Sequence, residues 1–294
     1  MRKLLITGAM FCALQAYGQV QQQMTPQIKQ YLVAYYDAVE RSDPQKAIQA
    51  LTLLITADPN YPNYYGARAS VLESLPDIPI DSILQDLDRA VTLDSTNTQW
   101  LAHRADLRLR IGTDQMRMAA YNDMWMVIKN DSTDLHSRIQ YLAFARINDT
   151  LRAAQIFREA ESLAFQKTVA QPDQAENWYQ LALVYTTYPE RIDGEMLIKI
   201  LGALNTATQL DPDNVTYYTL RADVYAKYMS ANPQLAISDY QYVLGLSPSR
   251  KVYIKLAQTQ LAAGLQSDAK ATLQQGLLLH PGNYVMRRLL KSST

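Results

Sequence analysis

The 294-residue chain has one cysteine, Cys12, few glycines and no excess of charge of either sign. A single cysteine excludes an intramolecular disulfide and a cysteine-based zinc site. The formal net charge is zero, with 28 basic and 28 acidic residues. This balance argues against a nucleic-acid partner, because such proteins use a basic surface to displace counterions from phosphates. With 10 glycines and 48% hydrophobic residues, the composition favours neither a β-rich fold nor a disordered chain.

Residue patterns for catalysis or cofactor binding are also missing. The three histidines, His103, His136 and His280, are scattered and have no metal-ligand spacing to one another. The sequence has no G-x-S-x-G nucleophile turn, no phosphate-binding glycine loop and no H-E-x-x-H zinc motif. We therefore expect a protein that is not an enzyme and that uses no cofactor and no metal.

The N-terminus is typical of a Sec signal peptide. Arg2 and Lys3 precede an apolar run that ends near Leu14, and the segment closes with Ala16, Tyr17 and Gly18. The run is shorter than the roughly 20 residues that cross a bilayer. Cleavage after Gly18 would remove Cys12 and leave 26 basic and 28 acidic residues. We expect an exported protein of the periplasm, the cell envelope or the medium, without a transmembrane segment in the mature chain.

Short helix-breaking motifs recur along the whole chain. They contain Pro, or Ser beside Asp or Asn, and the steps between them are 33 to 40 residues. Proline cannot continue a helix, whereas Asp, Ser and Asn can cap the helix that follows. These breaks lie at Pro59, Ser95, Ser132, Pro172, Pro212, Pro248 and Pro281.

Between the breaks, the apolar residues form two runs with helical spacing in each unit. The segment AENWYQLALVYTTY starts at Ala175 and places Trp178, Leu181, Ala182 and Tyr185 on one helix face. This pattern predicts that Trp178 lies in the core. The last unit shows the second run most clearly, with small, large and small residues before a proline: Ala269, Leu273, Gly276 and Pro281.

The sequence therefore resembles the tetratricopeptide repeat (TPR) family. The resemblance implies an all-α, right-handed superhelical solenoid of about seven helix-turn-helix repeats over residues 28–281. A signal peptide (1–18) and a short linker (19–27) would precede it, and a capping helix (282–294) would follow. We expect insertions at 75–80 and 188–193 and a long second helix in the fourth repeat. The repeats would begin near Ile28, Pro62, Thr98, His136, Ala175, Val215 and Arg250.

Three repeats share an arginine at position 7 of the first helix and an aspartate at position 23, on the second helix. The other four repeats have Ala or Leu at position 7 and no carboxylate at position 23. Because the two residue types occur together, we expect a charge-assisted bridge that joins the helices of one repeat. Ligand binding by the arginine is the alternative. The pairs are Arg68 with Asp86, Arg104 with Asp123, and Arg221 with Asp239.

The resemblance also implies a binding groove, because positions 2, 5, 9, 12 and 13 of the first helices line the concave surface in this family. The family's clamp for a chaperone C-terminus is absent, since Leu32 and Tyr36 replace its Lys and Asn. A solvated helix face is the alternative for each groove residue. The residues that we expect to contact a partner are Tyr36, Ser70, Asp106, Arg110, Tyr179, Asp223, Lys227 and Gln258.

From these features we expect a non-catalytic scaffold for protein–protein interaction in the bacterial cell envelope. A peptide or protein partner would dock in the concave groove. The alternative is a glycan-binding or envelope-assembly accessory protein that uses exposed tyrosine and tryptophan rings as stacking platforms. The sequence does not identify the partner.

Overall fold

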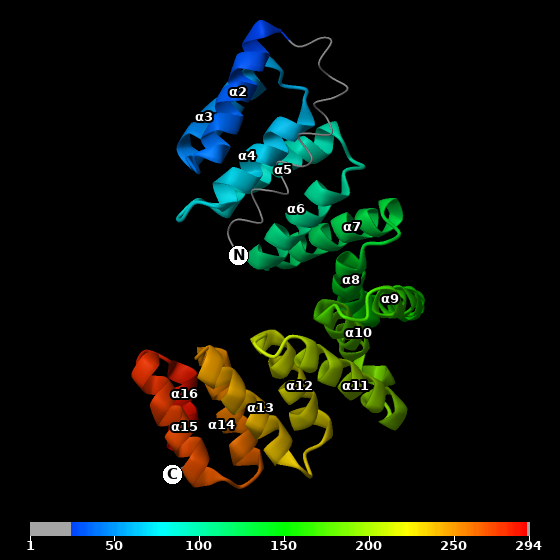
Figure 1. Cartoon of the computed structure of the whole chain (residues 1–294), viewed down its shortest axis with the longest axis vertical. Helices are drawn as coiled ribbons and strands as arrows, with labels where there is room; N and C mark the ends of the chain where they lie inside the picture. The colour runs from blue at the N-terminus through cyan, green and yellow to red at the C-terminus, as the bar shows by residue number, and fades with distance from the viewer. Residues whose placement is uncertain (1–24, 293–294) are drawn as a thin grey trace. The chain divides into compact units, whose positions relative to one another are not determined.

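The computed structural model describes residues 25–292, and these form fifteen α-helices, one short 3-10 helix and no strand (Figure 1). The predicted signal peptide, residues 1–18, lies outside the described residues, as does the linker up to residue 24. The helices are α2 Pro26–Glu40, α3 Pro44–Ala57, α4 Pro62–Glu73, α5 Ile80–Leu93, α6 Thr98–Ile111, α7 Asp114–Asn130, α8 Leu135–Asn148, α9 Thr150–Ala170, α10 Ala175–Thr187, η1 Pro189–Arg191, α11 Gly194–Leu210, α12 Val215–Tyr228, α13 Pro233–Leu246, α14 Arg250–Ala262, α15 Gln266–Leu279 and α16 Tyr284–Ser292.

In chain order the helices can be taken two at a time, from α2 and α3 to α14 and α15, as the first and second helices of seven repeats, and α16 follows the last. Each pair begins within two residues of the predicted start of a repeat. The largest difference is in the first repeat, where α2 begins at Pro26, inside the segment predicted as linker. Thr25 caps this helix by accepting a hydrogen bond from the amide of Ile28. The all-α fold of paired helices is therefore confirmed.

Short polar residues and prolines determine where the helices begin. Asn97, Asp193 and Asn214 each accept a hydrogen bond from a backbone amide in the first turn of the following helix. Four helices have proline at the first position, where the missing amide hydrogen costs no helical hydrogen bond. These four are α2, α3, α4 and α13.

The chain divides into two compact units, unit 1 up to Phe144 and unit 2 from Ala145. In each unit the helices pack mainly against their neighbours in the sequence. The core is therefore a series of small clusters. In unit 1, for example, Leu51 and Leu54 of α3 are buried in the first cluster. In unit 2, Leu273 and Met286 are buried in the last cluster, so α16 covers the end of the array.

The structure departs from the repeat pattern at the three places that the sequence indicates. Residues 74–79 form the long connection between α4 and α5, and residues 188–193 connect α10 to α11 and include η1. The second helix of the fourth repeat, α9, is the longest, with 21 residues. Over residues 25–292, no helix combines the length and the apolar character that a membrane span requires.

Candidate functional site

Each of the three arginines at position 7 holds the aspartate at position 23 with two parallel hydrogen bonds. In unit 2, Arg221 donates from Nε and Nη2 to the two carboxylate oxygens of Asp239, at 2.7 and 2.8 Å. The pairs in unit 1 have the same geometry, Arg68 with Asp86 and Arg104 with Asp123, at 2.7 to 2.9 Å. The three aspartates are 5–7% exposed, so these charge pairs lie inside the repeats. The hydrogen bonds to Asp86 raise the pKa of Arg68 above its ordinary value.

The third donor nitrogen of each arginine, Nη1, extends to the second helix of the preceding repeat. Arg68 donates to the Thr52 hydroxyl at 3.1 Å, and Arg221 donates to the Asn205 side-chain carbonyl at 2.9 Å. In both cases the acceptor lies 16 residues before the arginine. Each arginine therefore connects three helices, the two of its own repeat and one of the repeat before. We call Arg68, Arg104 and Arg221 the brace arginines.

The brace in α6 is extended into a network of four charges. Arg104 Nη1 donates to Asp88 of the preceding repeat at 2.9 Å, again 16 residues away. Arg108, one turn further along α6, donates to both Asp88 and Asp123, at 2.9 and 2.6 Å. Two arginines and two aspartates thus alternate across α5, α6 and α7. This network leaves the guanidinium groups engaged with the protein's own carboxylates, as expected for a structural role.

The predicted groove residues of unit 1 also form contacts between consecutive first helices. Glu73 on α4 accepts hydrogen bonds from His103, at 2.7 Å, and from Arg110, both on α6. The hydrogen bond from His103 and the nearby Arg110 lower the pKa of Glu73 to about 2. Asp106 lies 3.6 Å from His136 on α8, and its hydrogen bond and charge raise the pKa of His136. Arg110 and Asp106 nevertheless keep about half of their side-chain surface exposed.

In unit 2, two of the predicted groove residues take part in similar contacts. Asp223 on α12 accepts a hydrogen bond from Tyr240, at 2.5 Å, and another from Lys255 on α14, at 2.6 Å. Burial, followed by the hydrogen bond to Asp223, raises the pKa of Tyr240. Tyr179 on α10 lies 5.0 Å, between ring centroids, from Tyr217 on α12. Asp223 is thus half-buried and bound within the array rather than a free carboxylate.

The remaining predicted groove residues leave more of their side chains to solvent. Ser70, Lys227 and Gln258 are exposed, whereas Tyr36 is half-buried beside Tyr35. The Lys227 ammonium lies 5.0 Å from the ring centroid of Tyr228. Among the predicted groove residues, those that keep exposed side-chain surface are therefore Ser70, Asp106 and Arg110 in unit 1, the last two beside their partners, and Lys227 and Gln258 in unit 2.

The charged side chains on the first helices are held by contacts within the protein. Over the described residues 25–292, no group of three or more His, Cys, Asp or Glu side chains is placed to hold a metal ion. Glu73, Asp106 and Asp223 on the first helices are paired with residues of neighbouring repeats. Such pairing holds the side chains in fixed positions, and a pre-ordered surface loses less conformational entropy when a partner binds.

Comparison with known proteins identifies the fold. No protein-family model matches the chain, and no curated protein matches it in sequence. Among solved structures, the chain is similar to a tetratricopeptide repeat protein from Parabacteroides merdae, with a TM-score of 0.64 and 16% identity. The alignment covers 92% of this chain and 99% of that one. The chain has the TPR fold.

A second likeness is to a chain in the crystal structure of the APC/C hetero-tetramer Cut9–Hcn1. The TM-score is 0.60 at 12% identity, and the alignment covers 94% of this chain but 50% of the other. At these identities the likenesses concern the fold alone. They agree with the solenoid class predicted from the repeat pattern.

Several residues of this surface were missed by the sequence analysis. The polar acceptors of the brace arginines, among them Thr52 and Asp88, had a usable signal, because each lies 16 residues before its arginine. His103 and Lys255 had no comparable signal. Their partners, Glu73 and Asp223, are 30 and 32 residues away, and only the packing of successive first helices brings them together.

Proposed function

We propose that this TPR protein is a non-catalytic scaffold that binds a peptide or protein partner on the exposed faces of its first helices. The observation that supports this best is the pairing between consecutive repeats, such as Glu73 with Arg110 and Asp223 with Lys255. These pairs hold the first helices in register. In each unit they leave a pre-ordered polar surface, with exposed Ser70 in unit 1 and exposed Lys227 and Gln258 in unit 2.

The TPR fold supports this function because each repeat contacts only its neighbours and the first helices present a continuous surface. The similar chain in the Cut9–Hcn1 hetero-tetramer belongs to a protein assembly. In unit 2 the exposed groups combine a cation, Lys227, with the amide of Gln258. Such groups hydrogen-bond to backbone carbonyls and to acidic side chains of an extended or helical peptide.

Site-specific crosslinking in extracts of the native cell tests this function. We would replace Gln258, on the first helix α14, with a photo-crosslinking residue and use Gln275, exposed on the second helix α15, as the matched control position. A partner captured from position 258, and not from position 275, is the expected result. Equal capture at both positions, or capture of glycan alone, would contradict partner binding on the first helices.

We also propose that the protein acts in the cell envelope or outside the cell. This rests on the sequence of residues 1–18, with Arg2 and Lys3 before an apolar run. N-terminal sequencing of the protein purified from its native cell should find Gln19 as the first residue. A chain that begins at Met1 and fractionates with the cytosol would overturn this assignment without affecting the interaction function.

A further inference from the structure

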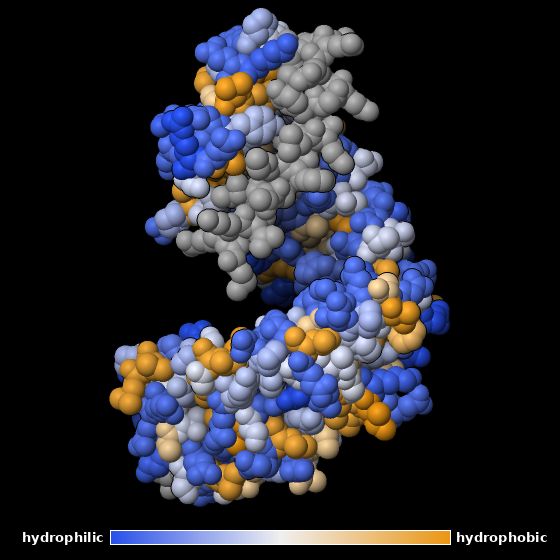
Figure 2. Space-filling view, viewed as in Figure 1, coloured by the Kyte–Doolittle hydropathy of each residue, from blue (hydrophilic) through white to orange (hydrophobic). Residues whose placement is uncertain are grey.

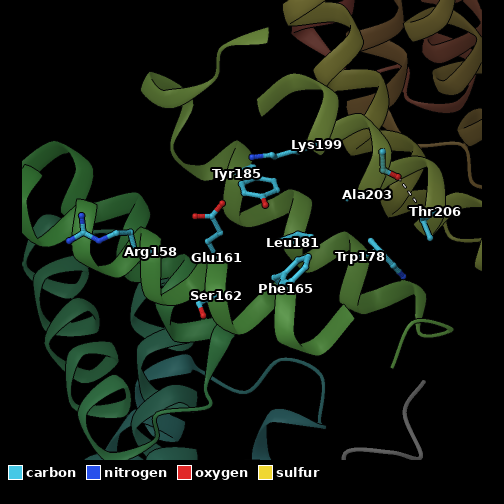
Figure 3. Close-up of a pocket in the computed structure, with 11 residues that line it drawn as sticks. Arg158, Glu161, Ser162, Phe165, Trp178, Leu181, Tyr185, Lys199, Ala203 and Thr206 are labelled. Atoms are coloured by element: carbon cyan, nitrogen blue, oxygen red, sulfur yellow. Dashed lines mark hydrogen bonds between the residues drawn. The ribbon is translucent and has the colours of Figure 1, made fainter. Parts of the chain in front are cut away.

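A cleft of about 690 Å³ lies in unit 2 between two second helices, α9 and α11, and above the first helix α10 (Figure 3). It contains none of the eight residues predicted for the groove, so it is a separate surface. The residues that line it are Arg158, Glu161, Ser162, Phe165, Trp178, Leu181, Tyr185, Lys199, Gly202, Ala203 and Thr206.

The cleft is open because the facing residues of α9 and α11 are small. Each helix contributes four residues at the spacing i, i+3, i+4 and i+7, the pattern of one helix face. Ser162 on α9 and Gly202 and Ala203 on α11 occupy the centre of these faces. A Cβ atom added at Gly202 would meet no other atom within 4 Å. The two helices therefore leave space where larger residues would close it.

One part of the cleft is apolar. Phe165 is 55% exposed, and it is drawn beside the buried Leu181 in Figure 3. Trp178 adds its half-buried ring, and its indole nitrogen already donates to the carbonyl of Pro172 at 2.8 Å. The exposed side chains of Val169 and Leu210 lie about one turn further along α9 and α11. Figure 2 shows hydrophobic surface over these two helices. Clusters of exposed apolar side chains mark interaction sites.

The other part of the cleft carries charge. Arg158 is exposed, and among the described residues it has no ion pair. Lys199 is paired with Glu195 at 2.8 Å, but this pair lies in solvent and is readily exchanged. Figure 3 shows Glu161 and Lys199 around Tyr185. Burial, followed by the charge of Glu161, raises the pKa of Tyr185 to about 12, so its hydroxyl stays neutral. Arg158 is thus the cation that is available to a bound group.

The chemistry of the lining favours a peptide over a sugar. A sugar needs many hydrogen-bonding partners, but the polar groups nearest the apolar part are already engaged: the Trp178 indole nitrogen donates to Pro172, the Thr206 hydroxyl donates to the carbonyl of Gly202 at 3.1 Å, and the Ser162 hydroxyl accepts from Gln166 at 3.5 Å. A bulky apolar side chain, in contrast, would cover Phe165 and Trp178 without leaving polar groups unpaired. Arg158 precedes Phe165 by seven residues of helix, or about 10 Å. A guanidinium group at that distance can bind a carboxylate with two hydrogen bonds.

We propose that this cleft binds a short segment of a partner protein, in which a bulky apolar side chain packs on Phe165 and Trp178 and an acidic side chain pairs with Arg158. The site lies outside the first-helix surface to which the proposed function assigns a partner. It gives the scaffold a second binding position in the same unit. It also predicts the partner's chemistry, an apolar residue and a carboxylate about 10 Å apart.

A peptide-display library, selected against the whole mature protein, tests the proposal. We expect enriched peptides that combine Phe, Leu or Met with Asp or Glu. For a synthetic peptide of the consensus, followed by fluorescence anisotropy, Phe165→Ala and Arg158→Glu should each weaken binding at least tenfold. Replacing the peptide's acidic residue with Lys should restore binding to Arg158→Glu. Arg288→Glu, an exposed arginine on α16, is the matched charge control and should leave binding unchanged.

Phe165 and Arg158 are exposed, so these substitutions should leave the fold intact, which far-UV circular dichroism would verify. Three results would overturn the proposal. They are a selection that enriches no peptide, a selection against the Arg158→Glu variant that enriches the same consensus as the wild type, and saturable binding of a glycan that Phe165→Ala abolishes. Loss of the peptide with Lys227→Ala, but not with Phe165→Ala, would place the peptide on the first helices. That result supports the proposed function and overturns this inference.

Discussion

Arg221 and Asp223 show how two neighbouring charged residues on one helix serve different contacts. Arg221 is directed to Asp239 on α13 and to Asn205 on α11. Asp223, two residues later, is directed to Tyr240 and Lys255. The first joins its repeat to the one before, and the second joins it to the one after. Both charged residues of the sequence Arg221-Ala222-Asp223 therefore connect neighbouring repeats.

The coupling between Arg221 and Asp239 can be measured with a double-mutant cycle. Removing one partner leaves the other charge unpaired in a mostly buried site. For a fully buried pair, this lowers the free energy of unfolding by about 3–5 kcal/mol. Arg221 is 16% exposed at its side chain, so we expect the lower part of that range for Arg221→Leu or Asp239→Leu. The double variant should be more stable than the sum of the single losses implies. Additive losses in chemical denaturation, with no coupling energy, would contradict a structural pair.

Glu73 should make the stability of unit 1 depend on pH in the acid range. Its pKa is about 2 in the folded chain, below the ordinary value of 4.5, because His103 and then Arg110 stabilise the carboxylate. A depressed pKa stabilises the fold above about pH 4.5, and that stability is lost as the pH falls toward 2. We expect Glu73→Gln to lower the melting temperature at pH 6 and to approach the wild type near pH 2.

The matched control for this experiment is Glu195→Gln, because Glu195 pairs with Lys199 in solvent and contributes little. Its melting temperature should follow that of the wild type over the whole pH range. A difference between Glu73→Gln and the wild type that stays constant from pH 6 to pH 2 would show that the Glu73 carboxylate does not stabilise the fold.

At the scale of helices, close approach between consecutive first helices depends on Gly66 in α4. A Cβ atom at this position would lie 2.2 Å from Nε1 of Trp100 on α6, so the indole ring would have to move. Overpacking of this kind costs about 1–3 kcal/mol. We expect Gly66→Ala to destabilise the protein by that amount in chemical denaturation. Gly245→Ala on α13 is the control, because its Cβ meets no atom within 4 Å, and it should be neutral or stabilising.

The helix pairs and the brace could be predicted from the sequence because both depend on spacing within one repeat. Proline and capping residues mark the helix starts, and the co-occurrence of arginine and aspartate indicates the bridge. The contacts of Glu73 with His103 and of Asp223 with Lys255 were not predicted. They connect different repeats, and their geometry depends on how successive helices pack.

The cleft between α9 and α11 was also missed, and Trp178 shows why. Its position in the W-x2-L-A-x2-Y pattern predicts a core residue, but the side chain is only half-buried and lines the cleft. The core prediction for Trp178 was therefore wrong. The repeat pattern assumes a neighbouring second helix with large residues, whereas α9 and α11 present Ser162, Gly202 and Ala203. The repeat pattern of one helix predicts which of its faces is apolar, but not the size of the residues that the neighbouring helices place against that face.

For the whole molecule, the packing of each helix on its neighbours in the sequence implies that stability is local. Repeat arrays behave approximately as a chain of units with nearest-neighbour interactions. Within each unit the described helices follow this rule, and the core consists of separate small clusters. A substitution should thus affect its own repeat and those next to it, rather than the entire array.

Hydrogen exchange of the Arg221→Ala variant tests this locality. Arg221 connects α11, α12 and α13. When amides exchange through local opening of the structure, a loss of about 1.4 kcal/mol in local stability makes their exchange roughly tenfold faster. We expect amides in these helices to exchange about 100-fold faster, in line with the loss of about 3 kcal/mol expected for removing one partner of the buried pair. Amides in α2 to α5, which contain no contact of Arg221, should exchange at the wild-type rate.

The reciprocal variant Arg68→Ala should accelerate exchange in α3, α4 and α5 and leave α12 and α13 unchanged. Uniform acceleration in either variant would mean that the repeats unfold together and that the braces act on the whole array.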